Sequence, residues 1–402
     1  MSARHVIVAG AGIGGLTAAL ALSRNGFRVT VLEQAERLEE TGAGIQLSPN
    51  AARTLIELGL GAALRRTAVA PELLRVRKAA TGREIVRMPL GKFVEERYGA
   101  PYWSIHRGDL QAALSGAVLE RPDISLRLGM RMEDHVVHPN GITVSARGRG
   151  GRSDERGIAL IAADGIWSQT RARLGFPEPP QFSGRIAWRA LVPAEDVAPE
   201  FREPQINLWL GRDAHLVHYP VKAGAAVNIV LIMDDTWNEP GWSVPAGRGE
   251  LLPRLSTRYW APQALALIAR PEAWLKWALF RRRPLTRWSK DCVTLIGDAA
   301  HPMLPYLAQG AAMAIEDAAV VAQCLAGMPD DVPQALRSYV AVRRGRANKV
   351  LRLALRNGDR YHHAGLMGLL RDTVMRTIGG TRLLYNYDWL YDWRPPAALS
   401  IT

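Results

Sequence analysis

Residues 5–33 constrain the fold of this chain more than any other stretch. The β-branched run HVIVA is followed at once by GAGIGG, by a helix-forming segment that stops near Gly26, and by a second β-branched run, RVTVL, which ends at Glu33. Strand, G-x-G-x-x-G, helix, strand and acid in this order are the fingerprint of a dinucleotide-binding βαβ unit. The sequence therefore predicts an α/β fold that begins with a parallel sheet.

The glycines and the acid of this unit have separate expected roles. Gly10, Gly12, Gly14 and Gly15 would let the backbone approach a pyrophosphate at the N-terminus of the helix. Glu33 would accept hydrogen bonds from a ribose diol. The alternative is a purely structural βαβ unit, which requires neither the full glycine set nor the acid.

Two later strands are each expected to end at a glycine–acid pair. IALIAA (158–163) stops at Asp164-Gly165, and CVTLI (292–296) stops at Gly297-Asp298. In parallel sheets, ligands bind beyond the carboxyl ends of the strands. Prolines 302 and 305 prevent a helix in the next turn. An alanine-rich helix should then begin at Gly310, with its unpaired N–H groups facing the Asp298 and Pro305 region, where negative charge would be stabilised.

A second glycine-rich loop, residues 41–50, stands where a plain NAD domain would have its third parallel strand, and such loops often wrap a ligand. A hairpin is expected from segments 73–79 and 83–88. Segments 185–192, 205–210, 214–219 and 226–233 have antiparallel spacing and could form the floor of an apolar pocket for an aromatic ligand. His215 and Tyr219 would share one face of this sheet, although spacing alone favours ordinary half-buried sheet residues.

Four peripheral features complete the expected organisation. Segments 125–128, 130–137 and 142–146 resemble a small antiparallel set, and residues 147–157 a mobile polar loop tip. A basic helix over 332–354 is expected to turn Arg343, Arg344 and Arg346 toward solvent or a partner. The aromatic stretch 385–393 should cover the core or form a dimer contact.

Composition narrows the classes of ligand and compartment. Lys and Arg number 51 against 38 acids, a formal charge of +13. The basic residues are scattered without a nucleic-acid motif, which favours anionic small molecules over nucleic acid as ligands.

No metal-binding spacing is present. Two isolated cysteines in apolar surroundings indicate a cytoplasmic protein. The uncharged stretch 6–22 could pass for a membrane span, but its glycines suit the βαβ unit better, and no stable membrane insertion is expected.

GAGIGG with Glu33, Asp164-Gly165, and Gly297-Asp298 with His301-Pro302 together resemble the class A, single-component FAD-dependent aromatic hydroxylases over nearly the whole chain. Within that family, GAGIQLSPN, HRGDL, HLVHYP and HPMLPYLAQGAAMAIEDA are most similar to the branch of salicylate hydroxylase and 3-hydroxybenzoate 6-hydroxylase. The resemblance implies a glutathione-reductase-like FAD-binding Rossmann domain, an antiparallel-sheet substrate domain and C-terminal helices. The implied division is 1–72, 103–178 and 281–330 for FAD binding, 73–102 and 179–280 for substrate, and 331–402 for the helices.

The resemblance also implies roles for individual residues. Gly10, Gly12, Gly15 and Glu33 would hold the ADP half of FAD, Arg107 would contact the cofactor, Asp298 would bind the ribityl chain, and Asp164 would serve both FAD and the nicotinamide donor. The helix start after Gly310 would face flavin N1 and the C2 carbonyl. His215 and Tyr219 match the pair that activates the phenol. The remaining expected contacts are Gly44, Gly297, Pro305, Ala311 and Ala312 for FAD, and Gln46, Arg189 and Tyr306 for substrate.

The activity that this resemblance implies is hydroxylation of a phenolic aromatic acid with NADH or NADPH and O2, through a C4a-hydroperoxyflavin. Three positions depart from near relatives: Pro305 stands where 3-hydroxybenzoate 6-hydroxylases have glutamine, and Gln46 and Tyr306 replace histidines of 6-hydroxynicotinate 3-monooxygenases. Three alternatives remain: a hydroxypyridine hydroxylase, an FAD-dependent dehydrogenase or quinone-pathway hydroxylase acting on a larger molecule, and a non-catalytic binding protein on the same fold. A homodimer is also expected.

Overall fold

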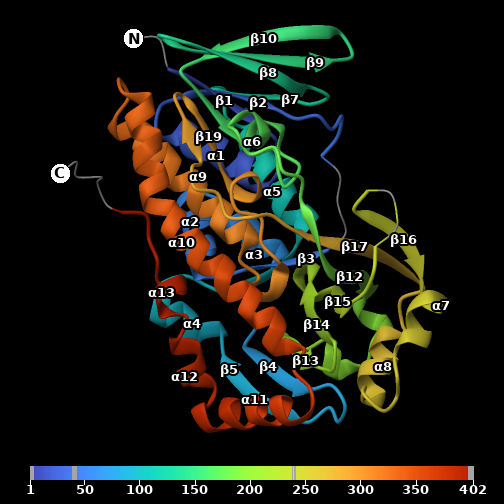
Figure 1. The fold of residues 1–402 in the computed structure, drawn as a ribbon. Coiled ribbons are helices and arrows are strands. Elements are labelled where there is room, and N and C mark those ends of the chain that lie inside the picture. The colour runs from blue at the N-terminus through green and yellow to red at the C-terminus, as the bar shows by residue number, and fades with distance from the viewer. Residues whose placement is uncertain (1–3, 39–42, 238, 240, 397–402) are drawn as a thin grey trace.

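The structure is a computed structural model that describes residues 4–38, 43–237, 239 and 241–396 (Figure 1). Thr41 and Gly42 of the predicted glycine-rich loop lie outside the described residues. Two large sheets organise the molecule. A six-stranded, mainly parallel sheet lies with helices at one end, and an eight-stranded, mainly antiparallel sheet lies at the other.

The six-stranded sheet has the order β18-β19-β11-β1-β2-β7. Its first βαβ unit matches the prediction: β1 and β2 pair in parallel, α1 joins them, and Gly26 after the helix has the left-handed φ of +82°. The bounds are β1 His5–Ala9, α1 Ile13–Arg24, β2 Arg28–Leu32, β7 Ile124–Arg127, β11 Ala159–Ala162, β18 Ser289–Lys290 and β19 Val293–Leu295.

The eight-stranded sheet has the order β16-β17-β12-β15-β14-β13-β4-β5. It contains the predicted hairpin and all four predicted segments of the floor. Its strands are β4 Leu73–Lys78, β5 Glu84–Pro89, β12 Gln181–Pro193, β13 Gln205–Leu210, β14 Ala214–Val221, β15 Ala226–Asp234, β16 Ser243–Gly247 and β17 Ala273–Arg281. A two-stranded ladder of β3 Gly44–Leu47 and β6 Trp103–His106 lies between the chain's two main parts, with β6 in contact with β14.

The helices cover the sheets and pack against one another. They are α2 Pro49–Glu57, α3 Gly61–Thr67, α4 Gly91–Tyr98, α5 Arg107–Leu119, α6 Gln169–Arg173, α7 Arg248–Leu251, α8 Pro262–Ile268, α9 Gly310–Gly327, α10 Val332–Tyr361, α11 Gly365–Ile378, α12 Gly380–Tyr385 and α13 Asp388–Tyr391. The long helix α10 runs beside α9 and on to the eight-stranded sheet, while α11 and α12 lie against β5 (Figure 1).

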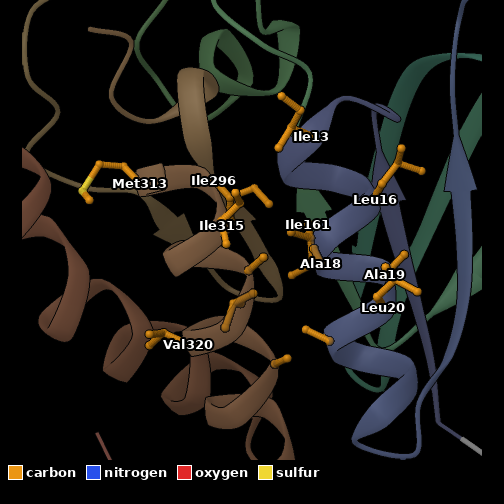
Figure 2. Close-up of a cluster of buried hydrophobic side chains, with 14 of the residues drawn as sticks. Ile13, Leu16, Ala18, Ala19, Leu20, Ile161, Ile296, Met313, Ile315 and Val320 are labelled. Atoms are coloured by element: carbon orange, nitrogen blue, oxygen red, sulfur yellow. The ribbon is translucent and has the colours of Figure 1, made fainter. Parts of the chain in front are cut away.

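The main core forms where α1 and α9 pack around the parallel sheet. Figure 2 shows Ala18 and Ile161 facing Ile296 and Ile315 across this contact. A Cβ on Gly14 would lie 3.1 Å from the Cβ of Ala314, so glycine allows the two helices to approach closely. Helix α9 is long and apolar enough to cross a membrane by composition, but 67% of it is buried within the fold. It is therefore packed as a core helix.

Two predictions for the middle of the chain were wrong. Segment 124–127 is β7, which pairs in parallel with β2 and supplies the strand missing after Glu33. Residues 147–157 are not a loop tip: β9 Gly141–Gly148 pairs with β10 Gly151–Gly157, and β8 Arg131–His138 completes a three-stranded sheet. Cross-strand ion pairs such as Arg147–Glu133 make these polar strands compatible with an exposed sheet.

The predicted solvent-facing arginines also required correction. Arg343 is fully buried and bonds Glu316 and Asp317, and Arg346 bonds Glu316. Only Arg344 is exposed, as expected. The aromatic stretch near residue 390 covers the core, since Trp389 and Trp393 lie against these arginines and Leu390 is buried. Both cysteines are free and buried, as predicted.

Candidate functional site

The glycine turn with Glu33 and the two glycine–acid pairs predicted at strand ends all lie at the carboxyl ends of four neighbouring strands. The sheet order places β2, β1, β11 and β19 side by side, so Glu33, Gly10, Asp164 and Gly297 lie along one edge. With about 4.8 Å between adjacent strands, the edge from Glu33 to Gly297 spans roughly 14 Å. One extended dinucleotide can contact all of these corners.

The glycine-rich turn is shaped by close backbone contacts. Gly10 has a φ of +101°, and a Cβ there would lie 2.5 Å from the carbonyl oxygen of Ala163. A Cβ on Gly15 would lie 1.9 Å from the carbonyl oxygen of Gly10, whereas a Cβ on Gly12 would meet nothing within 4 Å. The surrounding backbone therefore leaves no room for a side chain at Gly10 or Gly15. Gly12 leaves open space above the turn.

The carboxylate of Glu33 supports this turn. The backbone N–H of Ala11 donates to its Oε2 at 2.7 Å, and that of Ala35 donates to Oε1 at 2.8 Å. Each carboxylate oxygen can accept a second hydrogen bond. Glu33 therefore both fixes the turn and keeps acceptor capacity for hydroxyl groups.

Asp164 and Asp298 lie on the same edge. Oδ2 of Asp164 accepts from Thr170, while its Oδ1 is buried without a hydrogen-bond partner among the described residues. Asp298 is accessible to solvent although it lies deep among protein atoms. Burial raises the pKa of Asp298, against the opposing charges of His301 and Arg107. An accessible carboxylate in such surroundings lines an internal hollow.

A buried network fixes the Asp298 turn. Asp317 of α9 accepts from the backbone N–H of Gly297 at 3.0 Å and lies 2.5 Å from Nε2 of His301. Its other oxygen accepts from Nε of Arg343 at 2.7 Å. Burial alone would raise the pKa of Asp317, but the charges of His301 and Arg343 lower it to about 2. The carboxylate stays ionised and holds the turn against α9.

The N-terminus of α9 forms one wall of the hollow. Ala308 before it has a φ of +52°, an uncommon backbone conformation for alanine. The first hydrogen bond of the helix runs from the N–H of Met313 to the carbonyl oxygen of Gln309, so the amides of Gly310, Ala311 and Ala312 precede the helical ladder. Their dipoles favour an electron-rich group at this position.

The facing wall is the predicted floor of the eight-stranded sheet. The registers place Arg189, Val230 and Val217 in one cross-strand row, with His215 and Ile232 in the row two residues along one side. Tyr219 and Asn228 form the row on the other side. Side chains on one face alternate along each strand, so all these residues share a face. Val217, Val230 and Arg189 retain partial exposure in the middle of the sheet, which marks a cavity above an apolar centre.

Tyr219 belongs to a polar group at one end of this floor. The Tyr102 hydroxyl donates to Oε1 of Gln46 at 2.7 Å, and Gln46 also hydrogen-bonds Tyr219. Burial raises the pKa of Tyr219, with Arg189 and Gln46 opposing the increase. Asn228 accepts from the N–H of Gly44 at 2.7 Å. A Cβ on Gly44 would lie 2.7 Å from both the Tyr219 ring and Asn228, so glycine allows this close approach.

Arg189 is a partly buried cation, and no carboxylate of the described residues is among the charged groups that act on it. Its guanidinium lies 4.1 Å from the centroid of the Trp277 ring, and its Nε is buried without a hydrogen-bond partner among the described residues. Burial lowers the pKa of Arg189 to about 10, and the charge of Arg107 adds to the decrease. An anionic ligand would relieve the repulsion between these two arginines.

His215 lies at the other end of the floor, against the C-terminal end of α10. Its Nδ1 is 2.9 Å from Nε2 of His362, and its ring lies 5.5 Å from that of Tyr306 and 5.3 Å from that of Tyr361. Burial lowers the pKa of His215 well below its usual value, and the charges of His362 and Arg185 add to the decrease. The imidazole is therefore neutral near pH 7.

The remaining predicted contacts fall in two places. Pro305 is exposed at the start of a 3-10 turn, residues Pro305–Leu307, and Tyr306 within it is buried beside Arg185. Gly14 lies in the contact between α1 and α9 rather than on the open side of the turn. Sequence reasoning missed His362, Tyr102 and Asn228, because each acquires its place only through pairing between distant elements.

This arrangement of residues fits a flavin dinucleotide. The open space above Gly12, the unpartnered Oδ1 of Asp164 and the accessible Asp298 lie at the carboxyl edge of the parallel sheet, and the amides at the start of α9 follow the Asp298 turn. Fold and site together thus define an FAD-binding protein whose cofactor would end beside a second, largely apolar chamber.

Comparison with known proteins agrees with this class. Residues 3–354 match the family described as FAD binding domain. The 3-hydroxybenzoate 6-hydroxylase 1 of Aquipseudomonas alcaligenes is 38% identical over 388 residues, which are 96% of this chain and 97% of that protein. HpxO of Klebsiella pneumoniae, solved with FAD and uric acid, superposes with a TM-score of 0.83 at 26% identity and covers 95% of both chains. A salicylate hydroxylase substrate complex gives a TM-score of 0.81 at 26% identity over 98% of this chain and 96% of that one.

The chain belongs to the family of single-component FAD-dependent monooxygenases that hydroxylate aromatic rings. Its cofactors are FAD and a nicotinamide donor. The predicted class, fold and activity are thereby confirmed, including the antiparallel-sheet substrate part and the C-terminal helices.

Proposed function

We propose that this enzyme hydroxylates the ring of a monohydroxybenzoate, with retention of the carboxylate. The observation that carries the proposal is the floor itself, where a partly buried arginine and a buried histidine flank an apolar strip of two valines. A flat ring fits over the valines, a carboxylate pairs with Arg189, and a phenol hydroxyl approaches His215. The resemblance to 3-hydroxybenzoate 6-hydroxylase 1 over nearly the full length of both chains supports the same choice.

The proposed cofactor contacts follow the strand edge. Gly10, Gly12, Gly15 and Glu33 would hold the ADP half, with Gly14 supporting the turn through packing. Arg107, Asp164, Gly297 and Asp298 would hold the central part, and Gly44, Pro305, Gly310, Ala311 and Ala312 the flavin end. Bound FAD, once reduced by NADH or NADPH, supplies the activation of O2.

His215 is proposed to accept the phenol proton. Because Nδ1 faces His362, Nε2 is the nitrogen that remains for the substrate. The depressed pKa of His215 keeps the imidazole neutral near pH 7, so the lone pair of Nε2 is free to face the phenol hydroxyl. A phenolate ring is more electron-rich than a phenol and reacts faster with an electrophilic oxygen. Tyr219, held by Gln46, would orient the ring from the opposite end, and Tyr306 would close the chamber beside His215.

The test is NAD(P)H consumption by the purified yellow protein with a panel of hydroxybenzoates and hydroxypyridines, with product mass as the second readout. A monohydroxybenzoate should stimulate consumption and gain one oxygen. His215→Ala should retain flavin absorbance but lose about 10²–10⁴-fold in hydroxylation rate. Unchanged hydroxylation by this variant, or no stimulation by any hydroxybenzoate, would contradict the proposal.

His218→Leu provides a matched control on the same strand. His218 points to the opposite face of β14, and neither ring nitrogen has a hydrogen-bond partner among the described residues. Leucine suits the apolar contacts there, with Phe201 and Trp209 as neighbours. Hydroxylation should therefore persist in this variant.

A salicylate-type substrate is the second candidate, supported by the structural likeness to salicylate hydroxylase. Attack at the carboxyl-bearing carbon would expel CO2, so release of labelled CO2 from carboxyl-labelled substrate separates the two reactions. Two finer proposals accompany the function. The enzyme would act in the cytoplasm, consistent with its two buried free thiols, and it would form a homodimer, which a solution mass measurement tests.

A further inference from the structure

Beyond His215, a second histidine and a surface carboxylate continue from the floor toward solvent. Nε2 of His362 lies 2.9 Å from Nδ1 of His215, and Nδ1 of His362 lies 3.4 Å from Oδ1 of Asp234. His215 is 2% exposed and His362 8% exposed, whereas the side chain of Asp234 is 53% exposed. His215, His362 and Asp234 thus form a linear chain of groups that leads from a buried position to a solvent-accessible one.

Five parts of the chain surround the pair of His215 and His362: α10, β12, β15, the 3-10 turn at Tyr306 and the residues before β14. His362 itself caps the C-terminus of α10, where the helix dipole favours positive charge. Arg185 of β12 pairs with Asp234 at 3.0 Å and with Asp359 at 3.4 Å. Tyr306 and Tyr361 pack against His215. Asp213, before β14, is the further acid that acts on His362.

A cleft of about 590 Å³ opens at the outer end of this chain of groups. Arg185, Asp234, Asp235 and Asp359 are among the residues that line it. Water in this cleft can exchange protons with Asp234 directly. The inner end, at Nε2 of His215, faces the chamber in the proposed function.

We propose that His215, His362 and Asp234 form a proton relay that connects the substrate chamber with the charged cleft. In the resting state, Nδ1–H of His215 donates to Nε2 of His362, and Nδ1–H of His362 faces Oδ1 of Asp234. When the phenol O–H gives its proton to Nε2 of His215, the Nδ1 proton of His215 moves to Nε2 of His362. The Nδ1 proton of His362 then moves to Asp234.

This transfer conserves atoms and charge. The phenol becomes a phenolate, Asp234 becomes a carboxylic acid that passes its proton to water in the cleft, and both histidines remain neutral with exchanged tautomers. One proton moving in the opposite direction restores the starting state. Burial lowers the pKa of His362 to about 4, with Arg185 adding to the decrease and Asp234 opposing it. Both imidazoles are therefore neutral near pH 7, which suits transfer by tautomer exchange. At 3.4 Å, Nδ1 of His362 makes no hydrogen bond with Oδ1 of Asp234, which accepts instead from Nε of Arg185 at 3.0 Å. The last transfer therefore requires the Asp234 side chain to turn toward His362.

His362 is a positioning and relay residue, and its role rests on the proposed function of His215. Stopped-flow mixing of the FAD-loaded protein with a hydroxybenzoate in weak buffer, with a pH indicator dye, measures proton release on binding. His362→Gln retains an acceptor for His215 but cannot pass a proton, so release should slow at least tenfold while its amplitude, the binding constant and the flavin absorbance stay close to those of the native protein. His363→Gln makes the same change one residue along and should release protons at the native rate.

Rescue separates proton transfer from a structural defect. In His362→Ala, free imidazole in the buffer should restore fast proton release in a concentration-dependent way. A native release rate in His362→Gln, or no response of His362→Ala to imidazole, would overturn the relay.

A third experiment, which measures the histidine tautomers, requires no substrate. Nitrogen-15 NMR of histidine-labelled, FAD-loaded protein should find the resting proton on Nδ1 of both His215 and His362. A resting proton on Nε2 of His215 would overturn the relay, because the nitrogen toward the substrate would already be occupied. If no hydroxybenzoate is turned over by the native protein, the proposed function fails while this experiment still decides the relay.

Discussion

Arg189 is expected to lower the stability of the ligand-free protein and to strengthen binding of an anionic ligand. Its partly buried guanidinium stacks on Trp277 and feels the positive charge of Arg107, an arrangement that is costly until an anion binds. Arg189→Met should therefore leave the unfolding midpoint unchanged or higher. It should weaken binding of a hydroxybenzoate about 10–100-fold, the effect of losing a charged hydrogen bond, and leave binding of the uncharged phenol unaltered. Titration of flavin absorbance measures both constants, and equal losses for acid and phenol would refute the role.

Individual residues also mark the limit of prediction from sequence. The glycine turn with Glu33, the acids at strand ends and the pair His215 and Tyr219 were found because spacing or family resemblance marks them. His362 carries no such signal: it follows the end of a helix 147 positions from its partner. Arg343 was placed in solvent because basic residues on a helix are usually exposed. Its two acidic partners on α9 could not be paired with it from sequence.

Helix α10 offers a direct comparison of two glycines. Gly345 is exposed, and a Cβ added there would meet nothing within 4 Å, whereas a Cβ on Gly358 would lie 2.6 Å from the ring of Tyr306. Gly345→Ala should stabilise the protein by about 0.5–1 kcal/mol through helix propensity. Gly358→Ala gains the same propensity but must displace Tyr306, a strain of about 1–3 kcal/mol. Urea unfolding should shift in opposite directions, and a shift in the same direction would show that the end of α10 is not packed tightly on the sheet.

The contact between α9 and α10 depends on a buried ionic network. Arg343→Met removes the cation shared by Glu316 and Asp317 and leaves buried acids without full compensation. We expect a loss of about 3–5 kcal/mol in the free energy of unfolding. The matched change in the exposed neighbour, Arg344→Met, removes a hydrogen bond to the carbonyl oxygen of Thr286 and should cost only about 0.5–1.5 kcal/mol. Guanidinium chloride unfolding of both variants tests this, and equal losses would contradict the assignment.

At the scale of elements, regular strands and helices were predicted wherever apolar periodicity was strong. Both sheets of the site follow that pattern. The exceptions are β7, expected in an antiparallel set although it joins the parallel sheet, β10, whose charged sequence is typical of a loop, and β3, which lies within the predicted glycine-rich loop 41–50. In each case the pairing partner decides the structure, and pairing between distant segments is not encoded in local composition.

For the whole molecule, buried histidines predict a dependence of stability on pH. The folded pKa is lowered for His5, His135, His215, His218 and His362, to about 3 for His218 and about 4 for His362. The unfolded chain therefore binds more protons below about pH 6.5, and stability should fall as the pH decreases from there toward 4.5. Each fully buried histidine contributes at most about 1.4 kcal/mol per pH unit.

Urea midpoints measured at pH 7.5, 6.5, 5.5 and 4.5 test this dependence. Asp317 remains ionised across the window because its pKa is about 2. His218→Leu should reduce the change in unfolding free energy per pH unit by the contribution of one buried histidine, which is at most about 1.4 kcal/mol. A midpoint that is constant or rises toward pH 4.5 would show that these histidines are not held neutral.

The central claim is that an aromatic acid binds between the valine strip of the eight-stranded sheet and the N-terminus of α9. A crystal structure of the FAD-loaded enzyme with a hydroxybenzoate tests it most directly. We predict the ring over Val217 and Val230, the carboxylate on Arg189 and the hydroxyl within hydrogen-bond distance of Nε2 of His215. An acid bound instead in the charged cleft beside Asp234 and Asp359, with the strip uncovered, would contradict the account.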